Sequence, residues 1–170
     1  AELAPLWADL GERWLILDQY FKPYPVCRWA QPAVEAAMAL ARAHRLTPAA
    51  IQSVEVWSFH EACRLATRLP ATTEQAQYSL PFSVASALRH GTLGAAELSD
   101  AALNDAQTQR LSGSMVLHEN TLYTDRFPAE RWAPVLGTLQ HARTPDSEPA
   151  ITRGTPETAP SYREITRKLH

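Results

Sequence analysis

Apolar and polar positions alternate along this chain with two different periods. Over residues 33–44 the apolar positions recur every three or four residues, which predicts a helix with one face in the core. Over residues 51–59, Val54 and Val56 alternate with polar neighbours, which predicts a strand. A run of aliphatic and aromatic residues at 14–21 predicts a further strand. Helix and strand patterns are therefore mixed from the start of the chain.

The second half of the chain continues this mixture. A helix is predicted from Thr72 to about His90, and Pro81 inside it is expected to bend or break it. Ser161 is placed to cap a last helix, with Glu164 three residues on as its partner in a capping box. The weaker predictions are short helices within 100–111 and strands at 114–118, 132–140 and 150–153. Strands and helices follow no regular β-α-β order, so the pattern predicts an α+β fold.

Composition narrows the class of protein. The chain has 170 residues, of which 45% are hydrophobic and 20% charged, enough for one soluble domain with a core. Its net charge of −2 lacks the basic excess of a nucleic-acid binder, and no apolar run reaches the length of a membrane span. No secretory leader is visible, and the absence of an initiator methionine suggests a fragment or a trimmed chain.

The cysteines and glycines narrow the chemistry further. Cys27 and Cys63 are too few and too far apart for a disulfide framework, so we predict a reducing, cytoplasmic setting. The spacing of cysteines and histidines does not suggest a metal site. No glycine-rich phosphate loop occurs, so together with the spacing of the ligands we expect neither metal nor nucleotide.

The segment 21–32 carries the strongest candidate chemistry. Lys22 and Tyr24 each precede a proline, so both are expected to be extended and held in defined directions. A thiol, Cys27, and a guanidinium, Arg28, follow before the predicted helix. Stiff loops on a rigid scaffold commonly carry function. The alternative is that Lys22 is an ordinary surface lysine.

Three segments together resemble the MmgE/PrpD family, which includes 2-methylcitrate dehydratase, cis-aconitate decarboxylase and iminodisuccinate epimerase. The first motif is Lys22-Pro23-Tyr24-Pro25 with Cys27-Arg28 and a proline-led, alanine-rich helix. The second motif is Glu74-Gln75-Ala76-Gln77-Tyr78-Ser79-Leu80-Pro81-Phe82, and the third is Gly154-Thr155-Pro156 followed by Ser161 and Glu164. The similarity runs from about Leu15 to the C-terminus.

This resemblance implies the smaller, C-terminal lid domain of such an enzyme. We expect one α+β domain over 1–170 with a mixed or antiparallel sheet and helices on one face, and residues 1–13 as a linker or a remnant of a preceding helical domain. The implied substrates are small di- or tricarboxylates. The implied partner is a helical MmgE/PrpD-type domain or partner chain, which would supply acid and histidine groups, and a homodimer is left open.

The resemblance also assigns expected roles. Lys22 is the candidate catalytic residue, stabilising negative charge as a substrate loses a proton next to a carboxylate. At the position of Cys27 the decarboxylase-like relatives carry histidine and many others carry cysteine. Cys27 would therefore line the site, or it would serve as a small buried apolar group. Arg28 would bind a carboxylate through two hydrogen bonds or pair with an acid such as Glu35.

The remaining candidates depart from the family pattern or have a simpler alternative. Gln31 stands where several relatives have histidine, which weakens the loop as a source of acid or base. Phe82 stands where many have tyrosine, so its substrate contact would be apolar. Tyr24 would aim its hydroxyl at the substrate or pack in the core.

The resemblance therefore leaves two alternative functions. The first is the lid of a cofactor-independent lyase or isomerase, with a hydro-lyase reaction like that of 2-methylcitrate dehydratase ranked first among dehydration, decarboxylation and epimerisation. The isolated chain would be inactive. The second is a non-catalytic binding or assembly module, a split subunit or an inactive remnant that requires a helical partner chain.

Overall fold

The computed structural model describes residues 4–139 and 147–169, and the chain divides into two units. The first unit consists of Ala1–Pro23 and Arg153–His170, and the second of Tyr24–Thr152. We describe each unit by itself. The single domain expected over 1–170, with a linker at 1–13, stays a prediction.

The second unit contains seven helices and five strands among the described residues. In chain order they are α1 (Gln31–His44), β1 (Ile51–Ser58), α2 (His60–Cys63), α3 (Thr73–Gln77), α4 (Leu80–His90), α5 (Asp100–Leu103), α6 (Ala106–Gly113), β2 (Val116–Glu119), α7 (Thr121–Arg126), β3 (Trp132–Ala133), β4 (Val135–Leu139) and β5 (Ala150–Ile151). Short 3-10 turns at Pro48–Ala50 and Ala96–Leu98 connect them.

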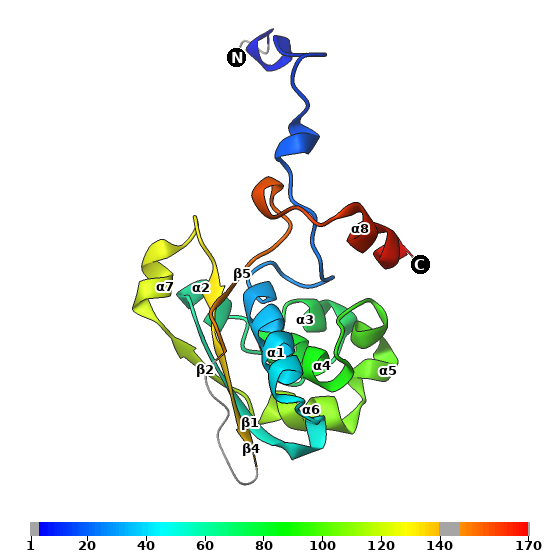
Figure 1. The fold of residues 1–170 in the computed structure, drawn as a ribbon, viewed down its shortest axis with the longest axis vertical. Helices are drawn as coiled ribbons and strands as arrows, with labels where there is room; N and C mark the ends of the chain where they lie inside the picture. Colours follow the sequence, from blue (N-terminus) through cyan, green and yellow to red (C-terminus); the bar gives the residue numbers. More distant parts are fainter. Residues whose placement is uncertain (1–3, 140–146, 170) are drawn as a thin grey trace. The chain divides into compact units, whose positions relative to one another are not determined.

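The strands form two small sheets. In the larger sheet the order is β2-β1-β4, with β2 parallel and β4 antiparallel to the central strand β1. The smaller sheet pairs β3 with β5 in antiparallel fashion. Helix α1 packs on β4 and on both strands of the smaller sheet, while α6 packs on β1 (Figure 1). The fold is α+β with a mixed sheet, as the sequence predicted.

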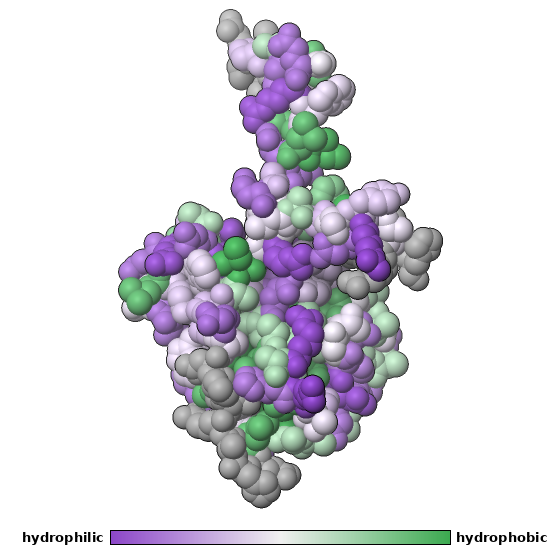
Figure 2. All heavy atoms as spheres, in the orientation of Figure 1, coloured by the Kyte–Doolittle hydropathy of each residue, from purple (hydrophilic) through white to green (hydrophobic). Residues whose placement is uncertain are grey.

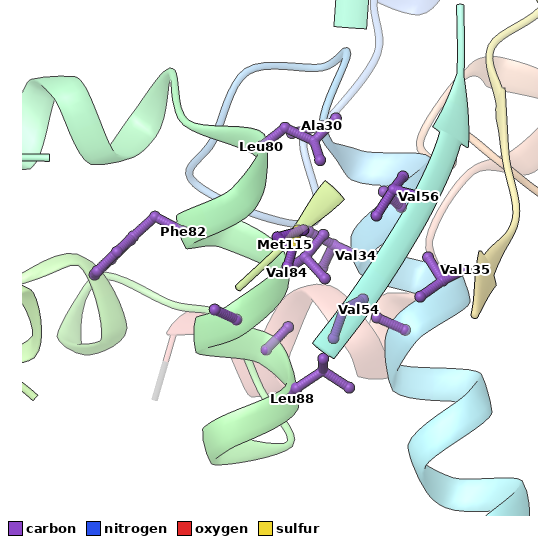
Figure 3. Close-up of a cluster of buried hydrophobic side chains, with 14 of the residues drawn as sticks. Ala30, Val34, Val54, Val56, Leu80, Phe82, Val84, Leu88, Met115 and Val135 are labelled. Atoms are coloured by element: carbon purple, nitrogen blue, oxygen red, sulfur yellow. The ribbon is translucent and has the colours of Figure 1, made fainter. Parts of the chain in front are cut away.

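The core lies between β1 and the helices. Val54 and Val56 of β1 are buried on the face that meets Val34 of α1 and Val84 of α4 (Figure 3). Val135 pairs with Val56 in register and continues this face into β4. Burying each such side chain contributes roughly 1.5–3 kcal/mol. The alternation over 51–59 predicted that Val54 and Val56 share a face, and the helical period over 33–44 predicted a helix face in the core.

Capping explains where α4 begins and where the predicted helix is interrupted. The Ser79 hydroxyl accepts a hydrogen bond from the Phe82 amide (3.0 Å), which fixes the helix start. Pro81 consequently sits in the first turn, where its missing N–H costs nothing. The helix predicted over this segment is broken, one of the two outcomes expected of Pro81. The break lies before the proline, at Tyr78–Ser79, and divides the segment into α3 and α4.

The first unit contains 3-10 turns at Ala4–Trp7, Leu15–Asp18 and Pro156–Thr158, and helix α8 at Tyr162–Leu169. The predicted capping box is confirmed, because the Glu164 carboxylate accepts from the Ser161 amide (2.8 Å) and the Ser161 hydroxyl accepts from the Glu164 amide (3.3 Å). The predicted strand at 14–21 is wrong. Its middle is a 3-10 turn in which Leu17 is 71% exposed.

The other predicted strands are found near their expected positions, but the observed strands are shorter than predicted. β2 lies at Val116–Glu119, and the predicted strand at 132–140 is divided into β3 and β4, with Gln140 outside the described residues. Among the residues described, no helix is both long enough and apolar enough to cross a lipid bilayer.

Candidate functional site

The loop before α1 is tied to the segment before α4. The Cys27 amide donates to the Gln77 carbonyl oxygen (2.8 Å), and this bond joins the first and second sequence motifs. Within the loop, the Ala30 amide donates to the Cys27 carbonyl (3.0 Å). Cys27 is half-buried at this junction. The two motifs, about fifty residues apart in sequence, therefore meet in the second unit.

Gln31 fixes the same loop from the first turn of α1. Its side chain is fully buried, and its Nε2 donates to the Tyr24 carbonyl (3.4 Å) and the Val26 carbonyl (3.3 Å). Its Oε1 accepts no hydrogen bond from the residues that the structure describes. Gln31 is one of the substrate-binding candidates from the sequence, and that role stays a prediction. The observed contacts show that its side chain holds the shape of the loop.

Tyr24 and Arg28 lie on this loop and are half-buried. The Arg28 carbonyl accepts from the Gln31 amide (3.3 Å), so its backbone is part of the turn that starts α1. Each therefore keeps part of its surface accessible, as a substrate contact would require.

Phe82 has a different environment. It is fully buried and leaves α4 on the side away from β1 (Figure 3). Its backbone amide is the one capped by Ser79. The aromatic ring is therefore a core residue in this structure, and the expected apolar contact between Phe82 and a substrate stays a prediction.

Lys22 belongs to the first unit and is exposed. Its neighbour Phe21 donates its amide to the Gly154 carbonyl (2.9 Å). Gly154 has φ +94°, a conformation that L side chains rarely adopt, and a Cβ there would overlap the Phe21 carbonyl oxygen. The third motif thus holds the chain next to Lys22. The sequence marked Gly154 only as part of a motif, since the contact spans most of the chain.

Other titratable groups form pairs outside this loop. His118 Nε2 lies 3.0 Å from Glu55 Oε2 while its ring stacks on Trp57 with centroids 4.7 Å apart. His60, the histidine next to the strand end, lies 2.9 Å from Glu119 Oε2. Burial raises the pKa of the Cys63 thiol to about 11, so it is protonated at neutral pH. No group of three metal-ligating side chains is found within the described ranges.

Residues 24–170 match the MmgE/PrpD C-terminal domain family. The chain belongs to this family. The match covers all of the second unit and the C-terminal part of the first, so it includes the first motif from Tyr24 onward, the second motif and Gly154. Lys22 and Pro23 lie just before the matched residues. A search of curated proteins found no match. The family consists of enzyme-associated domains. The match does not identify the substrate or the reaction.

Proposed function

We propose that this chain is the substrate-covering domain of an MmgE/PrpD-type enzyme that acts on small di- or tricarboxylates without a cofactor. A hydro-lyase reaction like that of 2-methylcitrate dehydratase is the first reaction to test. The observation that carries the proposal is the hydrogen bond from Cys27 to Gln77, because it brings two motifs of the family together around one loop.

Lys22 has the chemistry that such a reaction needs. In a dehydration, a base removes a proton from the carbon next to a carboxylate, and hydroxide leaves and is protonated to water. Negative charge builds up on the carboxylate as the proton leaves. A fixed ammonium group stabilises that charge, and one such electrostatic contact is worth roughly 3 kcal/mol in the transition state. In the proposal the base and the acid come from a helical partner domain.

The loop residues would position the substrate. Arg28 is half-buried and can bind a carboxylate with two parallel hydrogen bonds. Tyr24 and Cys27 would shape the same surface. Gln31 keeps the loop in place through its bonds to two carbonyl groups. Phe82 would supply the apolar contact expected of it only where a substrate reaches its buried ring.

The test is to mix the chain with a helical MmgE/PrpD-type domain and assay a panel of di- and tricarboxylates. Lys22→Ala should lower kcat about 100-fold and leave the melting temperature unchanged, because the side chain is exposed. Arg163→Ala, which removes another exposed cation of the first unit, is the matched control and should retain activity. Turnover that is the same in Lys22→Ala and wild type would reject the role of Lys22.

A second candidate function is a non-catalytic assembly module. The segment 7–21 favours it, because its large apolar side chains are exposed (Figure 2). They are Trp7, Leu10, Trp14, Leu15, Ile16, Leu17, Tyr20 and Phe21. A stable complex with the helical domain but no turnover of any substrate in the panel would support this function over the first.

A further inference from the structure

A hollow of about 300 Å³ lies in the second unit at the C-terminal ends of α1 and α4. These two helices pack on each other (Figure 1). The candidate site loop adjoins their first turns, and α1 has 14 residues, so its two ends are separated by about 20 Å. The hollow is therefore separate from the site around Cys27.

The lining of the hollow has two kinds of surface. Its apolar part comes from both helices and from the turn after α1: Met38, Ala41, Leu46, Pro48, Ala87 and Leu88. Its polar part is basic and consists of Arg42, Arg89 and His90. Arg42 and His90 are exposed, and Arg89 is half-buried.

The helix C-termini offset only part of this positive charge. Cations at helix C-termini often serve only to offset the exposed carbonyl groups there. Here the Ala41 carbonyl accepts from the Leu46 amide (3.0 Å), and the Ala87 carbonyl accepts from the Gly91 amide (2.8 Å). The Ala41 and Ala87 carbonyls therefore have backbone donors and do not need an arginine side chain as a partner.

One acid competes for this charge. The Asp105 carboxylate lies 3.5 Å from Arg89 Nε, but it also accepts from the Thr108 amide (2.8 Å) and the Thr108 hydroxyl (2.7 Å). Arg89 Nε is buried and has no hydrogen-bond acceptor in the described part of the chain. Arg42 forms none of the ion pairs found among the described residues. Two arginines thus line the hollow, and one of them has a carboxylate nearby.

We propose that this hollow binds a small organic monocarboxylate with a compact alkyl or aryl group. The apolar part of the ligand would contact Met38, Ala41 and Leu88, and its carboxylate would lie between Arg42 and Arg89. Both parts of the ligand are needed, because a hollow this small and open offers too little apolar area to hold a neutral molecule firmly. The proposal is independent of the chemistry assigned to Lys22.

The experiment is a titration of the full 170-residue chain with hexanoate, followed by the backbone amide signals in NMR. Hexanoate should shift the signals of Ala41, Ala87 and Leu88 in a saturable way, while hexanamide and acetate at the same concentrations should not. Arg42→Gln should weaken binding about threefold to fivefold, as expected for a partly exposed charge contact. Arg64→Gln, which removes an exposed arginine outside the hollow, should bind like wild type.

Because Arg42 is exposed, its replacement should leave the fold intact, and the unperturbed amide spectrum will verify this. Equal shifts with hexanoate and hexanamide would overturn the proposal by showing an apolar hollow without anion recognition. So would the absence of saturable shifts, or unchanged affinity in Arg42→Gln.

Discussion

The first sequence motif is divided between the two units, and its two parts are held in different ways. Residues 24–31 lie in the second unit, where the Gln31 side chain and the Gln77 carbonyl fix the loop against the core. Phe21 and Lys22 lie in the first unit, where the backbone bond from Phe21 to Gly154 holds an otherwise exposed segment.

Because of this difference, substitutions that affect stability can be told apart from substitutions that affect the proposed chemistry. Changes to the part in the second unit disturb buried contacts and should lower the free energy of unfolding. Changes to Lys22 remove an exposed charge and should affect turnover alone. An activity loss at Gln31 or Phe82 would therefore say little about substrate contact unless stability is measured with it.

The largest effect is expected from Phe82→Ala, which disrupts the buried packing of the second unit. The ring is fully buried beside the Ser79 cap, so its removal leaves a cavity in the helical layer. We expect a loss of about 3–5 kcal/mol in the free energy of unfolding, measured by urea denaturation. Tyr162→Ala is the control, since Tyr162 is 85% exposed, and it should change stability by less than about 0.5 kcal/mol. A loss below about 1 kcal/mol for Phe82→Ala would contradict the buried assignment.

Local signals in the sequence predicted the second unit better than the first. The helix predicted at 33–44 begins at Gln31, and β1 begins at Ile51 as predicted, because periodicity and burial agree in these segments. The strand predicted at 14–21 failed for a physical reason. A strand needs a partner to satisfy its backbone, and no strand pairs with Leu15–Asp18 among the described residues.

The candidate site was predictable only where its signals are local. Ser79 as an N-cap and Pro81 in the following turn could have been found from their spacing. The contact between Phe21 and Gly154 could not, because it depends on a long-range fold and on a φ value. The loop-holding role of Gln31 likewise depends on burial that a single sequence does not show.

A smaller and more local effect is expected from Gly154→Ala, which disrupts the contact between Phe21 and Gly154 in the first unit. The added Cβ would overlap the Phe21 carbonyl oxygen, and φ +94° is unfavourable for alanine. Strain of this kind costs roughly 1–3 kcal/mol. We expect faster hydrogen exchange at the Phe21 amide and easier proteolysis within 14–21, with urea unfolding of the second unit unchanged.

Gly113→Ala is the matched control for that experiment. An added Cβ there meets no atom within 4 Å, and the residue lies in the last turn of α6. This change should leave the Phe21 amide as protected as in wild type. Equal exchange rates in Gly154→Ala and wild type would show that the Phe21–Gly154 contact does not order the segment before Lys22.

The smallest expected effect is the pH dependence of Glu164, which distinguishes the first unit from the second. Hydrogen bonds from Arg153 (2.8 Å) and from the Ser161 amide and hydroxyl lower the pKa of Glu164 to about 2. An unfolded glutamate has a pKa of about 4.3. A lowered pKa means that the ionised form is favoured in the folded state. Its stabilisation of α8 is therefore fully present above about pH 4.3 and is lost as the pH falls toward 2.

The carboxyl carbon of Glu164, followed by NMR from pH 6 to pH 1.5, should titrate near pH 2. Arg153→Gln should raise that midpoint but leave it below the ordinary value, because the bonds to Ser161 remain. The unfolding of the second unit, monitored at the same pH values, should not follow this titration, since Glu164 belongs to the first unit. A midpoint near 4.3 in the wild type would mean that the capping box does not persist in solution, and that the third motif orders less of the first unit than its contacts indicate.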